Sequence, residues 1–205
     1  MEISNMGLFS KSKPKVSASP KLKCMLGDTA SYKCLFLASY RKIPIEIEWD
    51  EPSVLDDKMS ESLHMSNLNR FPCIEDGDFT VCGESAVMTY LNIKGREPTV
   101  HPRKARVLAM QQYWIQVLKT KFMPQVDSGD QGATALEALD KALIGQKYIT
   151  GEFSLADIHW AAALKVLEDS SKTSIFSKYK NITDWLAKMK TEIPDFDVKN
   201  QKVAA

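Results

Sequence analysis

Residues 71–91 read FPCIEDGDFTVCGESAVMTYL and combine three local signals in one short stretch. A Phe-Pro pair opens it, and two short apolar runs follow on either side of Gly77, where Asp-Gly-Asp is typical of a hairpin turn. A Glu-Ser pair then begins an apolar segment with helical spacing. The stretch therefore predicts two strands, a tight turn and a helix, at residues 73–76, 79–82 and 84–94.

The residues before this stretch alternate between strand and helix patterns. Residues 21–26 and 43–49 alternate polar and apolar side chains, as half-buried strands do. Residues 30–42 place apolar side chains at helical spacing, and residues 53–65 form a weaker helical pattern with Ser53 as candidate N-cap. The predicted order is β-α-β-α-β-β-α. It implies a mixed sheet with parallel pairing first, an antiparallel hairpin last, and helices on both faces.

The rest of the chain divides into three further parts. Residues 1–20 are rich in Ser, Lys and Pro and are interpreted as a flexible arm, ahead of a mixed domain at 21–95. Residues 96–102 contain two prolines and predict a linker. Every segment in 103–205 reads helical, and we expect Pro124 to end the first long helix. Gly95 is expected to close the preceding helix as a C-terminal glycine. The fold class is therefore α+β, with a mixed domain followed by an all-helical one.

The bulk composition excludes several classes of function. The chain has 27 basic and 26 acidic residues for a net charge of +1, which favours neither nucleic acid nor an anionic membrane as partner. No apolar run approaches the roughly 18 residues of a membrane span. All four cysteines lie in the first half without metal-site spacing, so we expect no metal and four reduced thiols in a cytoplasmic protein: Cys24, Cys34, Cys73 and Cys82.

Three motifs together resemble the cytosolic glutathione transferase superfamily. They are RFPCIEDGDFTVCGESAVMTYL at 70–91, YITGEFSLADIHWAAAL at 148–164 and YKNITDWLAKMK at 179–190, and the resemblance covers residues 21–195. It implies a thioredoxin-like domain followed by a helical domain. Ser154 to Asp157 also has the form of a capping box, with a hydroxyl followed three residues later by an acid. In this family the motif stabilises a buried helix and has no catalytic role.

The resemblance implies a glutathione site around the opening stretch. The family's proline, here Pro72, follows a cis bond, and the backbone of Phe71 would pair with the cysteinyl part of glutathione as an added strand. Ser85 and the helix start would hold the γ-glutamyl carboxylate, and Glu84 its ammonium. Without the resemblance, the Glu-Ser pair would be a plain N-cap with an acidic first turn. Arg70, with its neighbour Asn69, would loosely match the contact to the glycyl end.

The thiol of glutathione would be activated at the start of the first helix. A gapless count places the family's tyrosine position at Cys24 and its serine position at Asp28 or Thr29. Thr29 supplies a hydroxyl without any shift, and Ser31 does so if the helix begins slightly later. We therefore take Thr29 or Ser31 as the catalytic hydroxyl that stabilises the thiolate, although both could simply cap the helix. Tyr32 lies past the expected helix start.

The remaining expectations concern the second substrate and the assembly. Tyr113 and Trp114, with Leu118 and Phe122, are candidates for the wall of an electrophile pocket, although aromatic side chains at helical spacing are more often core. Cys24 and Cys34 are interpreted as small buried residues. The resemblance implies a homodimer, with glutathione as co-substrate and a small electrophile as partner.

Three functions fit these features. The first is an enzyme of a Ser-type or divergent class that conjugates glutathione in detoxification. The second is a binding or structural protein on the same fold, like the gamma subunit of the translation elongation complex. The third is a thiol oxidoreductase. It is disfavoured because the gapless serine or cysteine position, Asp28 or Thr29, holds no cysteine.

Overall fold

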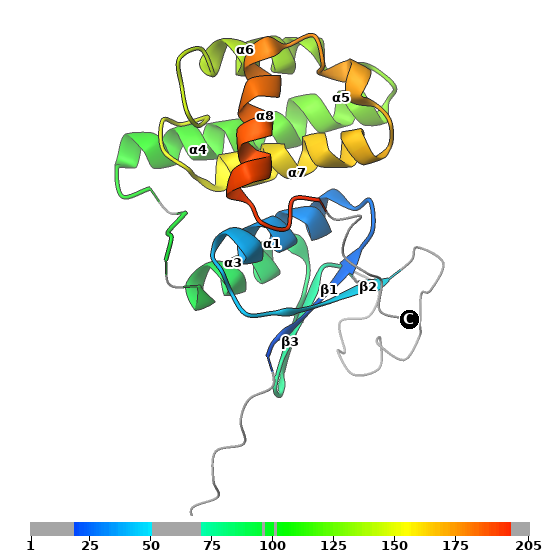
Figure 1. Cartoon of the computed structure of the whole chain (residues 1–205), viewed down its shortest axis with the longest axis vertical. Coiled ribbons are helices and arrows are strands. Elements are labelled where there is room, and N and C mark those ends of the chain that lie inside the picture. The colour runs from blue at the N-terminus through cyan, green and yellow to red at the C-terminus, as the bar shows by residue number, and fades with distance from the viewer. Residues whose placement is uncertain (1–18, 51–70, 96, 101, 198–205) are drawn as a thin grey trace, which may run out of the picture.

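The computed structural model describes residues 19–50, 71–95, 97–100 and 102–197 (Figure 1). Four of the expectations above lie outside these residues: most of the arm at 1–20, the helix at 53–65, and the side chains of Asn69 and Arg70. The expectation of helices on both faces of the sheet depends on residues 53–65 and stays a prediction.

The first domain contains a four-stranded mixed sheet in the order β2-β1-β3-β4. Strand β1 pairs with β2 in parallel and with β3 in antiparallel fashion, and β3 and β4 form the predicted hairpin. Leu22 and Cys24 of β1 are fully buried, as the alternation of polar and apolar residues predicts. The strands are β1 (Lys21–Met25), β2 (Glu46–Asp50), β3 (Cys73–Asp76) and β4 (Phe79–Cys82).

Two helices of the first domain, α1 (Thr29–Tyr40) and α3 (Glu84–Lys94), lie between the sheet and the helical domain (Figure 1). The described part of the helical domain contains α4 (Ala105–Val117), a π-helical segment (Leu118–Phe122), α5 (Met123–Asp127), α6 (Ala133–Ala142), α7 (Leu155–Asp169), a short 3₁₀ turn (Thr173–Ile175) and α8 (Lys180–Glu192). The predicted α+β class is confirmed.

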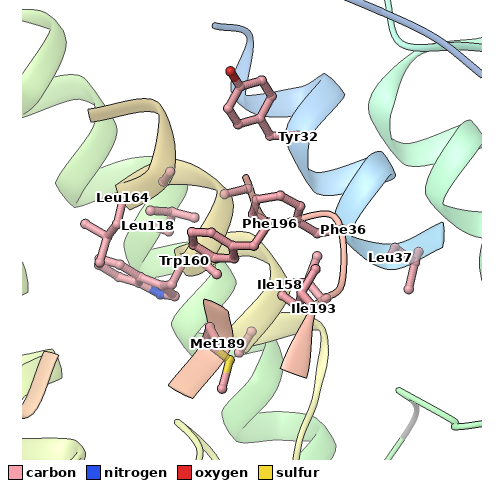
Figure 2. Close-up of a cluster of buried hydrophobic side chains, with 14 of the residues drawn as sticks. Tyr32, Phe36, Leu37, Leu118, Ile158, Trp160, Leu164, Met189, Ile193 and Phe196 are labelled. Atoms are coloured by element: carbon pink, nitrogen blue, oxygen red, sulfur yellow. The ribbon is translucent and has the colours of Figure 1, made fainter. Parts of the chain in front are cut away.

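The two domains share one hydrophobic core, in which α1 packs against α7. Figure 2 shows Phe36 of α1 beside Phe196 and Trp160, and the rings of Phe36 and Phe196 stack with centroids 4.8 Å apart. These three side chains are buried to 1% exposure or less. Burial of large aromatic side chains strongly favours association, so the position of α1 is fixed by the helical domain as well as by the sheet.

One expectation about a helix end is wrong, and another is confirmed. Pro124 does not end the first long helix, because the chain widens into the π-helical segment and continues through Pro124 into α5. Gly95 closes α3 as predicted, with φ −69°, so no left-handed conformation requires a glycine there. A Cβ at Gly95 would lie 2.7 Å from Nε of Arg41, so a close approach of side chain to backbone explains the glycine.

The expectation of four reduced thiols is also wrong for two of the cysteines. Cys73 and Cys82 lie directly opposite each other in the hairpin and form a disulfide. Cross-strand neighbours have close Cβ atoms, which brings two thiols within bonding reach. Cys24 and Cys34 are free and fully buried, as expected for small core residues.

Candidate functional site

The loop before β3 is joined to the start of α3. The Phe71–Pro72 peptide bond is cis, as the resemblance implies. The carbonyl of Pro72 accepts a hydrogen bond from the backbone N–H of Gly83 at 2.8 Å, and the hairpin disulfide lies beside this contact. The backbone edge at Phe71 and the first turn of α3 are therefore held as one unit.

The N-terminus of α3 carries no side-chain cap. Gly83 is the N-cap, with φ 98°, a conformation that favours glycine. Val87 is the first residue whose amide bonds back into the helix, to the carbonyl of Gly83. The amides of residues 84–86 therefore lie outside the helical ladder, at the positive end of the helix dipole. Ser85 is exposed, does not cap the helix, and its hydroxyl has no hydrogen bond within the described part of the chain.

Glu84 lies at the boundary between the domains with basic side chains on two sides. Its Oε2 accepts a hydrogen bond from Nζ of Lys33 in α1 at 3.0 Å, and its Oε1 lies 3.2 Å from Nζ of Lys119 in the helical domain. Burial alone would raise the pKa of Glu84. The charge and hydrogen bond of Lys33, with a smaller effect of Lys119, lower that pKa below its ordinary value. Glu84 is therefore ionised at neutral pH.

His159 of α7 lies behind this carboxylate. Its Nδ1 is 3.9 Å from Oε1 of Glu84, its side chain is 6% exposed, and Nδ1 has no hydrogen-bond partner among the described residues. Burial, together with the charges of Lys33 and Lys119, lowers the pKa of His159 to about 3, against the opposing effect of Glu84. The imidazole is therefore neutral at physiological pH and adds no charge to the site.

The start of α1 distinguishes the two candidate hydroxyls. Asp28 is the N-cap and accepts hydrogen bonds from the amides of Ala30 and Ser31. Ser31 is fully buried; its hydroxyl donates to Oδ2 of Asp28 at 2.7 Å and accepts from the amide of Met25 at 3.0 Å. Thr29 is the first helical residue and is half-buried, and its hydroxyl has no hydrogen bond in the described ranges.

Three other reactive groups near this loop are buried. The hydroxyl of Tyr32 donates to Asp169 of α7, and burial and this hydrogen bond raise the pKa of Tyr32 well above its usual value. Burial likewise raises the pKa of the thiols of Cys24 and Cys34. All three groups are therefore neutral at physiological pH. Among the described residues near the start of α1, Thr29 thus offers a hydroxyl that can still hydrogen-bond to a ligand.

The candidate pocket residues separate in the structure. Tyr113 is 55% exposed, whereas Trp114 is buried and packs edge-on against Trp160. Leu118 and Phe122 are fully buried core residues. Trp114 lines a cavity of about 390 Å³ whose wall comes from the helical domain alone: Arg106, Val107, Met110, Trp114, Ala142, Gln146, Ile149, Thr150 and Gly151. None of these wall residues belongs to α1 or to the loop before it.

Sequence reasoning did not find three residues around Glu84. Lys33 lies within the apolar run of α1, and a lysine on a buried helix face is the one local signal that could have pointed to it. Lys119 and His159 lie in distant helices, and no sequence spacing relates them to Glu84. Within the described ranges, no cluster of side chains could hold a metal ion, and no helix is long and apolar enough to cross a membrane.

Comparison with known proteins agrees with this architecture. The family model "Glutathione S-transferase, C-terminal domain" matches residues 125–192. A glutathione S-transferase of Hyoscyamus muticus is 24% identical over 161 residues, which span 64% of this chain and 74% of that protein.

Solved structures show the same fold over nearly the whole chain. A delta-class glutathione transferase of Nilaparvata lugens superimposes with a TM-score of 0.73 at 19% identity, over 89% of this chain and 93% of that one. A glutathione S-transferase bound with lactoylglutathione superimposes with a TM-score of 0.67 at 16% identity, over 88% and 99% of the two chains. The helical-domain match, the sequence relative and the shared fold agree: the chain has the glutathione transferase fold, and its residues 125–192 match the C-terminal domain of that family.

Proposed function

We propose that this protein is a glutathione transferase that conjugates glutathione to small electrophiles. The proposal rests on one observation. The hydrogen bond from Gly83 to Pro72 holds the backbone of Phe71 beside the start of α3, where no side chain caps the helix. A tripeptide with a central backbone edge and an anionic end matches such a surface, because both its parts would be bound at once. The structural relative with bound lactoylglutathione adds support.

In this proposal the protein binds glutathione along the opening stretch. Ser85 and the α3 amides take the γ-glutamyl carboxylate, Glu84 takes its ammonium, and the backbone of Phe71 before Pro72 pairs with the cysteinyl part. Arg70 would serve the glycyl end, and Tyr113 and Trp114 stay candidates for the electrophile pocket. The protein uses no metal or other cofactor.

Thr29 activates the thiol in this proposal. Its hydroxyl lies at the N-terminus of α1, where the helix dipole favours a negative charge, and Asp28 already satisfies the amides of Ala30 and Ser31. A hydrogen bond from Thr29 to the thiolate would lower the thiol pKa and increase the fraction of nucleophile. Ser31, with both bonds of its hydroxyl made inside the loop, is instead proposed to hold β1 and α1 together.

The first test is calorimetric binding of glutathione to the wild type and to Ser85→Ala. We expect the wild type to bind and the variant to bind more weakly.

Conjugation to a chromogenic aryl halide then compares Thr29→Ala with Thr29→Ser and Ser31→Ala. Thr29→Ala should lose about a hundredfold in kcat/KM, the usual effect of removing one donor to a developing anion, and Thr29→Ser should keep most activity. Absence of glutathione binding by the wild type would instead leave a transferase-shaped interaction module.

We also propose a homodimer that works in the cytoplasm in detoxification. Phe79 is 46% exposed and stacks on Tyr90, and they line an apolar groove of about 540 Å³ with Val81, Ser85, Ala86 and Thr89. Exposed apolar patches of this kind favour protein contacts, and family dimers join subunits across both domains. Sedimentation should show a dimer for the wild type and monomers for Phe79→Asp. The control Ile144→Asp changes an exposed apolar side chain of the helical domain and should stay dimeric.

A further inference from the structure

The charges around Glu84 do not balance. Lys33 and Lys119 bring two positive charges to one carboxylate, and His159 is neutral. The two lysines differ in exposure, because the side chain of Lys33 is 7% exposed and that of Lys119 is 42% exposed. Lys33 is therefore the buried counter-ion of Glu84, and Lys119 is a second cation that remains open to solvent and to a ligand.

Lys119 is also held in place by its own helix. It lies in the π-helical segment, between Leu118 and Phe122, which are both fully buried in the core. Wide π turns often occur at functional sites, where they turn a side chain out of the regular helical order. The backbone that carries Lys119 is thus anchored in the core of the helical domain, and its Nζ reaches Glu84 in the first turn of α3.

The Lys119–Glu84 pair has the charge pattern of an amino-acid zwitterion. The γ-glutamyl end of glutathione carries one ammonium and one carboxylate on a single carbon atom. If that end enters between the two side chains, its ammonium replaces Lys119 at Oε1 of Glu84, and its carboxylate receives Lys119 together with Ser85 and the α3 amides. Nδ1 of His159, buried and unpartnered 3.9 Å from Oε1, can donate to Glu84 as the carboxylate adjusts.

We propose that Lys119 is a specificity-determining residue that binds the γ-glutamyl carboxylate, so that glutathione is recognised by both domains together. This proposal rests on the proposed glutathione site. Charge-assisted hydrogen bonds to a carboxylate are stronger than neutral ones, and a lysine that opens one pair to form another needs little reorganisation. In this proposal Lys119 contacts the γ-glutamyl end of glutathione, away from the reacting thiol. It should therefore affect binding of glutathione rather than the chemical step.

The experiment measures the affinity of wild type, Lys119→Met and Lys121→Met for two ligands by calorimetry. One ligand is glutathione, and the other is the analogue in which hydrogen replaces the γ-glutamyl α-carboxylate. Lys121 is the matched control, because it is an exposed lysine of the same π-helical segment. We expect Lys119→Met to bind glutathione about tenfold more weakly, to bind the analogue as the wild type does, and Lys121→Met to behave as the wild type with both.

The outcomes distinguish failure of this proposal alone from failure of the proposed function. If the wild type binds glutathione and Lys119→Met binds it equally well, the role of Lys119 is wrong and the transferase proposal stands. An equal loss for both ligands would also overturn the proposal, since the lysine would then act on the fold rather than on the carboxylate. If the wild type does not bind glutathione, both proposals fail. In steady-state assays the expected signature is a raised KM for glutathione with kcat unchanged.

Discussion

The hydroxyl of Tyr32, in α1, donates a hydrogen bond of 3.0 Å to Oδ2 of Asp169, the last residue of α7. The same hydroxyl accepts the backbone N–H of Gly27 at 3.4 Å, and Lys165 pairs with Oδ1 of Asp169 at 2.8 Å. Gly27 belongs to the loop that precedes Thr29, the first residue of α1. The C-terminal end of α7 therefore positions the loop next to the candidate catalytic hydroxyl.

The substitution Tyr32→Phe should reduce both stability and turnover. It removes one buried hydrogen bond to a charged group, so we expect a loss of about 2 kcal/mol in the free energy of unfolding, and a lower kcat because the loop at Gly27 is released. Denaturant titration and conjugation kinetics measure the two effects. Tyr148→Phe is the control, because Tyr148 makes its hydrogen bonds to Glu192 within the helical domain. Equal loss of turnover in both variants would contradict the positioning role.

Burial of neutral His159 should make the protein sensitive to mild acid. Its folded pKa of about 3 lies below its ordinary 6.5, so the unfolded chain takes up the proton first as pH falls. The stability contribution is complete above pH 6.5 and is lost at about 1.4 kcal/mol per pH unit below it. Burial is the main cause of this low pKa; Lys33 and Lys119, which face the imidazole, lower it further, and Glu84 opposes them.

The comparison of wild type with His159→Gln isolates this effect, because the two proteins share every other titrating group. Chemical unfolding at neutral pH and at one pH unit below 6.5 should show a difference that grows by ~1 kcal/mol in favour of the variant. A parallel dependence of both proteins on pH would show that His159 is not buried in its neutral form.

Asp157→Ala should be among the most destabilising substitutions in the helical domain. Asp157 is fully buried, and its carboxylate accepts hydrogen bonds from the amides of Ile149 and Ser154 and from Nε1 of Trp185. Removing it leaves these donors unsatisfied, which costs ~3 kcal/mol or more. Ser154→Ala, which removes only the N-cap hydroxyl, should cost about 1 kcal/mol. Thermal unfolding ranks the two variants, and a ranking in the opposite order would contradict the role given to Asp157.

The hairpin disulfide predicts a specific pattern of thiol labelling. Protein purified without reductant and unfolded in iodoacetamide should carry label on Cys24 and Cys34 alone, and reduction before labelling should add Cys73 and Cys82. Peptide mass spectrometry assigns the labelled sites. Label on all four cysteines without reduction would show that the pair is reduced in the isolated protein.

Local signals predicted the hairpin and its helix well. The strands at 73–76 and 79–82 and the helix at 84–94 have the predicted bounds, because turn residues and apolar periodicity act over a few neighbouring positions. The capping box at Ser154 and Asp157 is confirmed for the same reason. Helix ends were less predictable, as Pro124 shows, because a π turn accommodates a proline that a regular helix would exclude.

The candidate site could be predicted only in part. The family resemblance of residues 70–91 implied the cis bond before Pro72, and the local pattern of the same stretch predicted the Glu-Ser start of α3. The choice between Thr29 and Ser31 could not be made from spacing, because it depends on which hydroxyl the neighbouring chain already binds. Only the folded loop puts Ser31 between Asp28 and the amide of Met25, and leaves Thr29 unbonded within the described residues.

The sequence by itself determined the order of the described strands and helices and the division into a mixed and a helical part. These depend on local periodicity and turn chemistry, which neighbouring residues carry. The proposed glutathione site follows from the family resemblance of residues 70–91. The tertiary structure alone decided the surroundings of Glu84, where Lys33, Lys119 and His159 come from three separate helices. Electrostatic contacts depend on distance and burial, and both are set when the helical domain packs on α1 and α3.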